Sequence, residues 1–467
     1  MNKPDIVLVL LDDLGWRDLS CYGSTFYETP NIDRLAAGGM KFTDAYASCP
    51  VCSPTRASLL TGKYPATLGV TDYIDREGAP PRRGKLMDVP YVKQLATGEF
   101  NLARALKAGG YQTWHVGKWH LGGEEYYPER QGFDLNIGGS DKGFPHDGYF
   151  SPWKIASLPD APEGTYLTDH ITDEAIRLIR TRDPNRPFFL NLWHFAVHTP
   201  LQAPRDLVEK YERKARSLGL DAIPEFAGGE EHPMLLLRPK QVFRRTQQSD
   251  PVYAAMIENL DTNIGRLLEA LGDNTLVLFC SDNGGLNSTV SPTRGLWSAP
   301  TTNRPLAEGK GWMYEGGTRG PLIAKWPGKI QPGGVCNAPV TSPDFYPTLL
   351  EAAGLPLRPQ QHMDGVSFLP ALRGAVDFDR GPIFWHYPHY NHSAGTPGSS
   401  VRDGDWKLIE FFEDGRLELY NLREDIGETR NLATAHPDIA RGLHAKLTAW
   451  RQGIEAKIPQ PNPDWTE

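Results

Sequence analysis

The chain has 467 residues and a formal net charge of −8, so it is long enough for one large α/β domain and a smaller one. Its longest apolar run, residues 6–11, is too short to span a bilayer, and no block of lysine and arginine forms a nucleic-acid-binding surface, so we expect neither a membrane nor nucleic acid as a partner. The five cysteines are odd in number and thinly spread, which argues against a disulfide framework.

Strand-like and helix-like segments alternate along residues 1–375. Apolar strands are predicted at residues 6–11, 41–47, 112–116, 187–195, 275–280 and 321–326. Helices are predicted at residues 30–37, 52–60, 101–108, 171–180, 252–271 and 344–353. This alternation indicates an α/β domain with a large, mostly parallel sheet sandwiched by helices.

The pattern changes near residues 373–380. Residues 406–412 and 416–422 form a predicted hairpin around an Asp-Gly turn, and residues 437–453 form a predicted helix. We therefore expect a second domain at residues 376–467, a smaller C-terminal α+β unit with an antiparallel sheet and a helix. Residues 75–89 and 221–239 are long and polar, and are expected to be loops that act as lids or substrate walls.

The start of the sequence predicts the compartment. Residues 1–5 lead directly into the first strand, without an apolar leader followed by a small-residue cleavage site. The sequence as it stands therefore predicts a cytoplasmic protein. A periplasmic or secreted location is the alternative, in case a leader has been removed.

Acidic side chains follow two of the predicted strands. Asp12 and Asp13 come directly after residues 6–11, and Asp282 and Asn283 follow residues 275–280. An isolated Asp-Asp pair is more often a helix cap or a turn than a site. Ligands of open α/β sheets, however, bind beyond the carboxyl ends of strands, and oxygen ligands suit a hard cation, Ca²⁺ or Mg²⁺, better than zinc.

Residues 52–62, CSPTRASLLTG, form the most specific local pattern. A single cysteine is more often a buried apolar side chain than a nucleophile. Cys52, however, is expected at a helix N-terminus, where the dipole favours anionic groups, with Arg56 one turn later on the same face. The string resembles the signature of type I sulfatases, C-x-P-x-R followed by an apolar turn and Thr-Gly. In that family the cysteine is oxidised to formylglycine, whose hydrate is the nucleophile.

Four further segments resemble segments of the same family, in the same order. They are residues 11–16 (LDDLGW), 117–122 (GKWHLG), 281–285 (SDNGG) and 310–317 (KGWMYEGG). Residues 419–422 together with Glu428 and residues 431–432 look like the closing hairpin of the family. The resemblance covers nearly the whole chain and implies the sheet of the alkaline phosphatase superfamily.

The resemblance implies a metal site and a set of catalytic residues. Ca²⁺, with Mg²⁺ as the alternative, would be held by Asp12, Asp13, Cys52, Asp282 and Asn283. The catalytic residues would be Cys52, Arg56, Lys118, His120, His198 and Lys310.

The chemistry of a sulfate ester suits these residue types. The ester is an anion, so the two lysines, Lys118 and Lys310, would screen and bind it, although either alone would be a surface residue. By resemblance, His120 would deprotonate the free hydroxyl of the sulfated hydrate and expel sulfate. His198 would bind substrate and protonate the leaving alcohol, with His194 as a rival in the same segment.

The substrate is indicated more weakly. Aromatic and histidine residues cluster at Trp119, residues 144–146, Trp297 and residues 385–390, either as structural loop aromatics or as a substrate wall. In the second case His386 and His389 would contact the substrate from the smaller domain. The chain looks closer to sulfatases of sulfated sugars and to bacterial arylsulfatases than to choline sulfatase, so a sugar sulfate is expected ahead of a simple aryl sulfate.

The predicted function is hydrolysis of a sulfate monoester, which requires a formylglycine-generating maturation enzyme as a partner. The nearest alternative is a phosphonate monoester or phosphodiester hydrolase of the same superfamily. Two-zinc phosphatases are disfavoured, because Asn283 stands where such enzymes often carry histidine. A non-catalytic sulfate-binding protein is the alternative from a different class.

Overall fold

The computed structural model describes residues 3–75, 77–159 and 161–466. Among these residues, nine strands form one sheet in the order β11-β2-β10-β8-β1-β5-β3-β4, with β12 beside β2. The strands are β1 (Asp5–Leu11), β2 (Met40–Tyr46), β3 (Gln112–Gly117), β4 (Leu135–Ile137), β5 (Phe188–Trp193), β8 (Thr275–Ser281), β10 (Arg319–Lys325), β11 (Gly334–Cys336) and β12 (Val340–Thr341).

The sheet is mostly parallel, as predicted, but β10 runs antiparallel to both of its neighbours, β2 and β8. The predicted strand at residues 321–326 therefore exists with a direction that its sequence did not indicate. The central strands β8, β1, β5 and β3 are parallel to one another. Their carboxyl ends consequently lie along one edge of the sheet.

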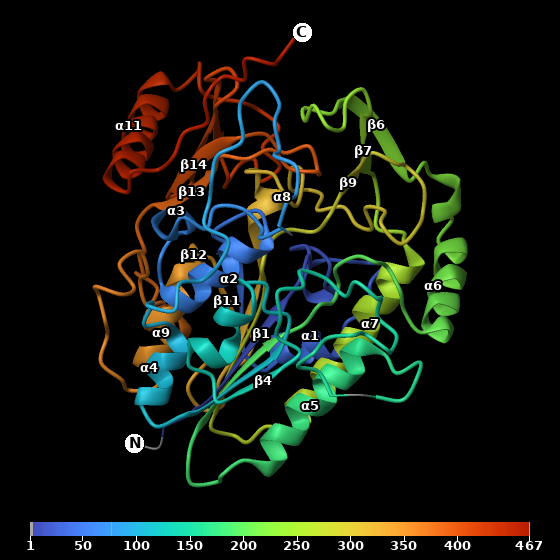
Figure 1. Ribbon diagram of the computed structural model, residues 1–467, viewed down its shortest axis with the longest axis vertical. Coiled ribbons are helices and arrows are strands. Elements are labelled where there is room, and N and C mark those ends of the chain that lie inside the picture. The colour runs from blue at the N-terminus through green and yellow to red at the C-terminus, as the bar shows by residue number, and fades with distance from the viewer. Residues whose placement is uncertain (1–2, 76, 160, 467) are drawn as a thin grey trace.

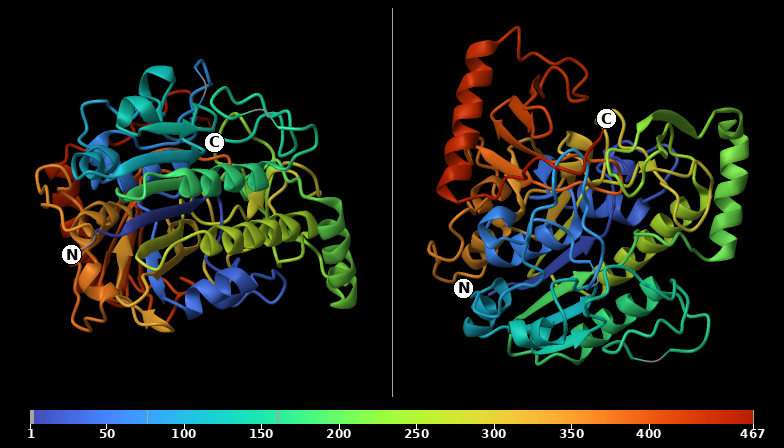
Figure 2. Two further views of the ribbon diagram at one scale, coloured as in Figure 1. Left: turned by 90° about the horizontal axis from the view of Figure 1, so that it is seen from below. Right: turned by 45° about the horizontal axis from the view of Figure 1, so that its top comes forward.

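Helices cover both faces of this sheet (Figures 1 and 2). One face carries α1 (Pro30–Ala37), α5 (Leu167–Thr181) and α7 (Pro251–Glu269), and α6 (Arg205–Ser217) packs against α7. The other carries α2 (Cys52–Thr61), α3 (Pro65–Leu68), α4 (Leu102–Ala108), α9 (Phe345–Ala352) and α10 (Leu369–Leu372). The predicted α/β sandwich is confirmed; α6 was not predicted.

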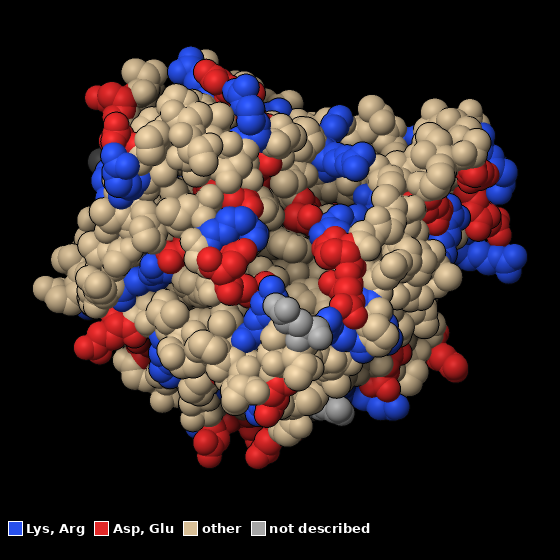
Figure 3. Space-filling model, turned by 90° about the horizontal axis from the view of Figure 1, so that it is seen from above, with Lys and Arg blue, Asp and Glu red and all other residues tan. Residues whose placement is uncertain are grey.

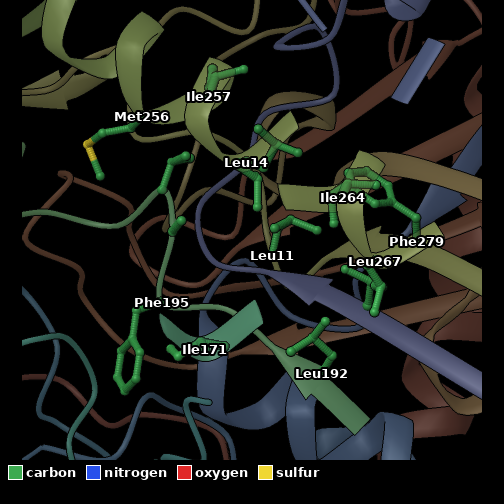
Figure 4. Packing of buried hydrophobic residues seen from close by; sticks show 14 of the residues in the cluster. Leu11, Leu14, Ile171, Leu192, Phe195, Met256, Ile257, Ile264, Leu267 and Phe279 are labelled. Atoms are coloured by element: carbon green, nitrogen blue, oxygen red, sulfur yellow. The ribbon is translucent and has the colours of Figure 1, made fainter. Parts of the chain in front are cut away.

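The alternation of side chains along β1 explains why the sheet needs two layers. Its odd-numbered side chains from Val7 to Leu11 pack into the core with α5 and α7, and its even-numbered ones from Ile6 to Leu10 pack into the core with α2 and α9. Figure 4 shows Leu11 of β1 near Ile264 and Leu267 of α7. Each such side chain contributes about 1.5–3 kcal/mol by leaving water. An apolar strand of this kind is stable only when both faces are covered.

A second sheet lies at the C-terminus. It is antiparallel in the order β13 (Ile383–Tyr387), β14 (Gly398–Asp403), β15 (Trp406–Phe411) and β16 (Leu417–Asn421). One face packs against α11 (Pro437–Gly453), and the other shares a hydrophobic cluster with Tyr46, Val51 and Met313 of the preceding part. The predicted hairpin and helix are present, while β13 and β14 were not predicted. The division at residue 375 stays a prediction.

The segment predicted as a loop at residues 221–239 is partly wrong. It contains β6 (Phe226–Glu231), which forms a small sheet with β7 (Gln241–Arg245) and β9 (Ser288–Thr289). This sheet and the C-terminal sheet stand on opposite sides of the top of the molecule in Figure 1. The shorter helices are α8 (Glu315–Thr318), η1 (Ser20–Tyr22), η2 (Glu124–Tyr126), η3 (Pro128–Gln131), η4 (Leu220–Ala222) and η5 (Ser342–Asp344).

Three expectations from the sequence remain: the compartment, the loop at residues 75–89 and the absence of a membrane-spanning segment. Met1 and Asn2, part of the start that predicted the compartment, and Arg76 in the loop at residues 75–89 lie outside the described residues. No helix in the described part of the chain has the length and apolar character to cross a membrane. The compartment itself stays a prediction.

Candidate active site

The strand register brings the predicted acidic residues together. Leu11 at the end of β1 pairs with Ser281 at the end of β8, so Asp12 and Asp282 emerge side by side. The backbone N–H of Asp282 donates to the Leu11 carbonyl at 3.0 Å, which fixes that register beyond the last paired residues. Seen from above, this end of the molecule has a hollow near its middle with acidic and basic side chains around it (Figure 3).

The acidic groups converge closely enough to hold a cation. Ligand atoms of Asp12, Cys52 and Asp282 all lie within 4.8 Å of one another, and so do those of Asp12, Asp13 and His198. Asp12 Oδ1 and Asn283 Oδ1 are buried without a hydrogen-bond partner. Unpaired buried oxygens are costly, and carboxylate and amide oxygens are the donors that a hard divalent cation prefers. The described residues therefore fit a metal ion of that type.

The pKa of Asp12 reflects the same crowding of buried acidic groups. Burial raises the pKa of Asp12 to about 7, although Lys118 lowers it, and the neighbouring carboxylates of Asp282 and Asp13 raise it further. A carboxyl group in this position favours its neutral form unless more positive charge is present. A bound cation would supply that charge.

Three basic side chains pair with the three acids. Lys118 Nζ lies 2.6 Å from Asp12 Oδ2, and Lys310 Nζ lies 2.7 Å from Asp13 Oδ1. Arg56 donates to Asp282 Oδ2 from Nε at 2.9 Å and from Nη2 at 2.7 Å. Because Arg56 is fully buried, it balances the acids without access to solvent. The catalytic role that the resemblance implies for Arg56 stays a prediction.

Lys118 reaches the site because β3 ends at a glycine. Gly117 has φ of 104°, and a Cβ there would lie 1.9 Å from the Trp193 carbonyl oxygen. The Lys118 N–H donates to that same carbonyl at 2.7 Å. Only glycine fits at position 117, and the tight approach directs Lys118 toward the acids.

Asp13 is held in a left-handed backbone conformation with φ of 61°. Burial opposes its charge, yet Lys310 and His198 hold the pKa of Asp13 below its usual value. Asn283 Nδ2 donates to Asp13 Oδ1 at 2.8 Å, and the Asp13 N–H donates to Asp282 Oδ1 at 3.3 Å. The carboxylate is therefore ionised, and its position depends on both strand ends.

Cys52 is the first residue of α2, as predicted, and is 4% exposed. Burial raises the pKa of its thiol, although Lys118 and Lys310 lower it. The helix N-terminus therefore does not produce the thiolate that its dipole suggested. An unmodified thiol in this place is protonated at neutral pH and is a poor nucleophile.

His120 faces Cys52. Its Nδ1 lies 3.4 Å from Cys52 Sγ, and its Nε2 lies 2.6 Å from the Ile74 carbonyl oxygen. A carbonyl only accepts, so Nε2 carries the proton and Nδ1 presents a lone pair to position 52. Burial and Lys118 lower the pKa of His120 well below its usual value. His120 is thus a neutral proton acceptor aimed at position 52.

His198 has the opposite arrangement. Its Nδ1 lies 2.7 Å from the Thr199 carbonyl oxygen and therefore carries the proton, while Nε2 lies 3.6 Å from Asp13 Oδ2. Burial and Lys310 lower the pKa of His198 to about 3. Two electron-rich atoms that face each other attract a proton or a cation between them. The rival His194 is buried, and neither of its ring nitrogens has a hydrogen-bond partner among the described residues.

The structure does not bring His386 and His389 to this cluster. His386 Nδ1 lies 2.7 Å from Ser399 Oγ, and its Nε2 lies 3.0 Å from the Lys457 carbonyl oxygen. His389 lies 2.9 Å from Thr71 Oγ1 and 3.1 Å from Asp88 Oδ1. Both rings are buried and already bonded to protein groups. A substrate contact through either of them stays a prediction and needs these bonds to break.

Sequence reasoning missed two supports of the site. Ile74 accepts from His120 with its backbone carbonyl, and its N–H bonds to Ser53 Oγ at 3.0 Å. Trp193 lies beneath the Arg56 guanidinium at 5.1 Å. A backbone carbonyl leaves no trace in the sequence, whereas Trp193 lies in a predicted strand and pairs with Leu10, two residues before Asp12.

Comparison with known proteins agrees with this geometry. Residues 4–355 match the family model described as Sulfatase, and residues 308–453 match the model described as N-sulphoglucosamine sulphohydrolase, C-terminal. A protein of Formosa agariphila named Sulfatase is 34% identical over 99% of this chain and 93% of its own length. Human N-acetylgalactosamine-6-sulfatase is 31% identical over 98% of this chain and 87% of its own length.

A solved structure extends the likeness to three dimensions. The structure described as Ps i-CgsB in complex with k-i-k-neocarrahexaose has a TM-score of 0.75 and 27% identity, covering 96% of this chain and 93% of that one. Sulfatases of this family generally use a metal ion and formylglycine, and the acid cluster described above fits a metal. The chain therefore belongs to the sulfatase family and is a sulfuric ester hydrolase.

Proposed function

We propose that the chain hydrolyses a sulfate ester of a sugar to the free hydroxyl and inorganic sulfate, with a formylglycine made from Cys52 as its nucleophile. One observation carries the proposal. Cys52 lies at a helix N-terminus between a histidine lone pair and an acid cluster that is paired with the buried Arg56 and Lys118 and with the partly buried Lys310. That is the arrangement that transfer of an anionic sulfuryl group requires.

Lys118 and Lys310 bind the sulfate group in this proposal. Burial lowers the pKa of Lys310, but Asp13 and Cys52 raise it by more. The net pKa therefore lies above its usual value, and the side chain stays charged. With a metal ion held by the acid cluster, Asp12 and Asp13 would pair less fully with Lys118 and Lys310. The ammonium groups then face the sulfate oxygens, whose charge grows as the ester bond breaks.

We assign the metal to Asp12, Asp13, Asp282 and Asn283, with the group at position 52 beside it. Their oxygen donors favour Ca²⁺, with Mg²⁺ as the alternative. Such an ion would supply positive charge next to the sulfate oxygens and the nucleophile. Asn283 Oδ1 and Asp12 Oδ1, which are buried without a hydrogen-bond partner, would gain one in this way.

Hydrated formylglycine supplies two hydroxyls at position 52, one to attack sulfur and one whose deprotonation expels sulfate. His120 Nδ1 accepts that proton, because its Nε2 is committed to the Ile74 carbonyl. The burial that keeps His120 neutral also keeps it able to accept. Formation of the group needs a maturation enzyme, which we propose as a partner of the chain.

His198 delivers the proton to the leaving hydroxyl in this proposal. With its pKa lowered to about 3, the free ring is neutral and cannot act as an acid at neutral pH. The negative charge of a bound sulfate ester raises that pKa, because an opposite charge nearby favours the imidazolium. Substrate binding therefore favours protonation of His198, which is the acid that the reaction needs.

A sugar is favoured over a simple aryl group as the leaving alcohol. The relative named N-acetylgalactosamine-6-sulfatase matches almost all of the chain, and the structural neighbour was solved with a neocarrahexaose. A sugar alkoxide is a poor leaving group, so a placed acid such as His198 is useful. We propose a sulfated sugar or oligosaccharide as the substrate.

The test compares paired substrates. The protein, coexpressed with a formylglycine-generating enzyme and supplied with Ca²⁺, is assayed on sulfated sugars, 4-nitrophenyl sulfate and 4-nitrophenyl phenylphosphonate. We expect kcat/KM to be highest on a sugar sulfate and lowest on the phosphonate. A higher value on the phosphonate would instead establish the phosphonate hydrolase alternative.

A further inference from the structure

Three aromatic rings extend outward from His198. The Phe144 ring is stacked on the His198 ring, with centroids 5.9 Å apart and planes 6° apart. Trp297 meets Phe144 edge to face at 5.5 Å, and His146 lies 4.1 Å from Phe144. The rings form a path that begins at the side chain placed to protonate the leaving hydroxyl and ends at the surface.

Trp297 is unusual because it is 57% exposed, whereas Trp119, Trp193 and Trp385 are fully buried. An indole ring leaves a large apolar surface in water when it is exposed, and such surface often marks a binding site. Residues 291–297 are all exposed, whereas Ser298 and Ala299 are buried. Trp297 is therefore the last residue of an exposed segment, directly before the chain returns to the interior.

The position of Trp297 is coupled to the catalytic segment. The Leu201 N–H donates to the Leu296 carbonyl at 2.8 Å, only three residues after His198. Phe144 bridges the two segments through its ring contacts with His198 and Trp297. The end of the exposed segment that carries Trp297 is therefore held close to the His198 segment by one backbone hydrogen bond and by Phe144.

A saccharide is the occupant that fits this path. In the proposed function Lys118 and Lys310 hold the sulfate group, so the alcohol that is released lies toward His198. Phe144 covers His198, and the group that continues outward next meets Trp297. One face of a sugar ring is apolar and its rim is polar, which suits an exposed indole and an exposed imidazole, those of Trp297 and His146, that both contact Phe144.

Resting on the proposed function, we propose that Trp297, with Phe144 behind it, binds the sugar unit next to the sulfated one. The chain then prefers a sulfated oligosaccharide over the matching sulfated monosaccharide. Trp297 determines this specificity, and it does not touch the reacting atoms.

The test uses a ratio that is insensitive to partial misfolding. Sulfate release is measured on oligosaccharides from carrageenan, chondroitin sulfate and heparin, each paired with its sulfated monosaccharide. The readout is the kcat/KM ratio of oligosaccharide to monosaccharide. We expect Trp297→Ala to lower this ratio about tenfold, the loss typical of truncating an aromatic anchor, mainly through KM of the oligosaccharide.

Two further variants separate a binding role from a structural one. Trp297→Phe keeps an aromatic face and should retain most of the ratio. Leu218→Ala removes an exposed apolar side chain after α6 and should leave the ratio unchanged. A wild-type ratio that does not favour the oligosaccharide, or a ratio unaffected by Trp297→Ala, overturns the inference.

The same assay separates this inference from the proposed function. Release from 4-nitrophenyl sulfate but from none of the saccharides overturns the sugar subsite while sulfatase activity stands. A protein with mass-verified formylglycine that releases sulfate from no substrate, 4-nitrophenyl sulfate included, contradicts the proposed function and the inference together.

Discussion

Two clusters of charged side chains flank the segment from Lys310 to Arg319, and both contain the same number of acidic and basic residues. The active-site cluster contains three acids and three bases: Asp12, Asp13, Asp282, Arg56, Lys118 and Lys310. The second, called the sheet-contact cluster, lies between α8 and the C-terminal sheet and also contains three of each: Asp44, Glu315, Glu428, Arg319, Arg402 and Lys407.

The clusters differ in how their charges alternate. In the sheet-contact cluster Lys407 Nζ lies between two acids, 2.9 Å from Glu315 and 3.0 Å from Glu428. Arg319 similarly joins Glu315 and Asp44. In the active-site cluster the acids instead converge on one another and on Cys52. Alternating charges hold two parts of a fold together, whereas converging like charges leave room for a cation.

A perturbed pKa alone does not separate the two. Burial raises the pKa of Asp12 to about 7 in one cluster, and burial raises the pKa of Glu428 to about 7 in the other. Geometry decides: within the described residues the sets of metal-ligating atoms that lie within 4.8 Å of one another include Asp12 and none of the sheet-contact residues. The comparison predicts that the first cluster governs rate and the second governs stability.

The largest effect is expected from Cys52→Ala. Loss of the nucleophile should lower kcat for sulfate release at least about a thousandfold, while the free energy of unfolding changes by less than about 1 kcal/mol. Ion chromatography of released sulfate and urea unfolding measure the two. A variant that retains activity would show that position 52 is not the nucleophile.

Lys407→Met should give the reverse pattern. It leaves Glu315 and Glu428 buried without their shared cation, which costs about 3–5 kcal/mol of unfolding free energy. Lys446→Met is the matched control, because Lys446 pairs with Asp403 in a half-exposed position and should change stability by less than about 1 kcal/mol. The folded Lys407→Met protein should keep its sulfate-release rate. A Lys407→Met protein that is as stable as the wild type but inactive would contradict the assignment of the sheet-contact cluster to stability.

His198→Ala sharpens the comparison within the active-site cluster. Loss of the acid should lower kcat/KM on a sugar sulfate about a hundredfold or more. The loss on 4-nitrophenyl sulfate should be clearly smaller, because nitrophenolate leaves without a proton. Equal losses on both substrates would assign His198 to sulfate binding rather than to proton transfer.

The smallest effect concerns pH. A carboxyl whose pKa is higher in the folded state binds its proton more tightly when folded, so stability falls as pH rises between the two pKa values. For Glu428 this window runs from its ordinary value of 4.5 to about 7. Glu428→Gln should flatten the decline across the window by on the order of 1 kcal/mol, measured by urea unfolding at several pH values. If the unfolding free energy of the variant declines with pH as steeply as that of the wild type, a group other than Glu428 takes up the proton.

Much of the site could be predicted because its residues follow buried strands. The apolar runs that became β1 and β8 are distinctive, and the acids after them necessarily meet once the strands pair in parallel. The Cys52 helix was likewise foreseeable from its proline and its arginine spacing. The chemistry therefore depended on strand ends, which single-sequence patterns locate well.

Other features had no local signal. The antiparallel direction of β10 depends on its neighbours, and β13 and β14 enclose a loop that contains proline and glycine. His386 and His389 lie in an aromatic stretch that looks like a binding wall, yet their rings bond to Ser399, Thr71 and other groups within the protein. Which way a side chain points in such a stretch depends on distant partners.

The most direct test of the proposed nucleophile is the mass of the peptide that contains Cys52, measured on the sample whose sulfate release has been assayed. Conversion of cysteine to formylglycine replaces SH₂ by O and lowers the mass by about 18 units. We expect the rate of sulfate release to rise in proportion to the fraction of the peptide that carries formylglycine. Full activity in a sample whose peptide carries only unmodified cysteine would contradict the proposal.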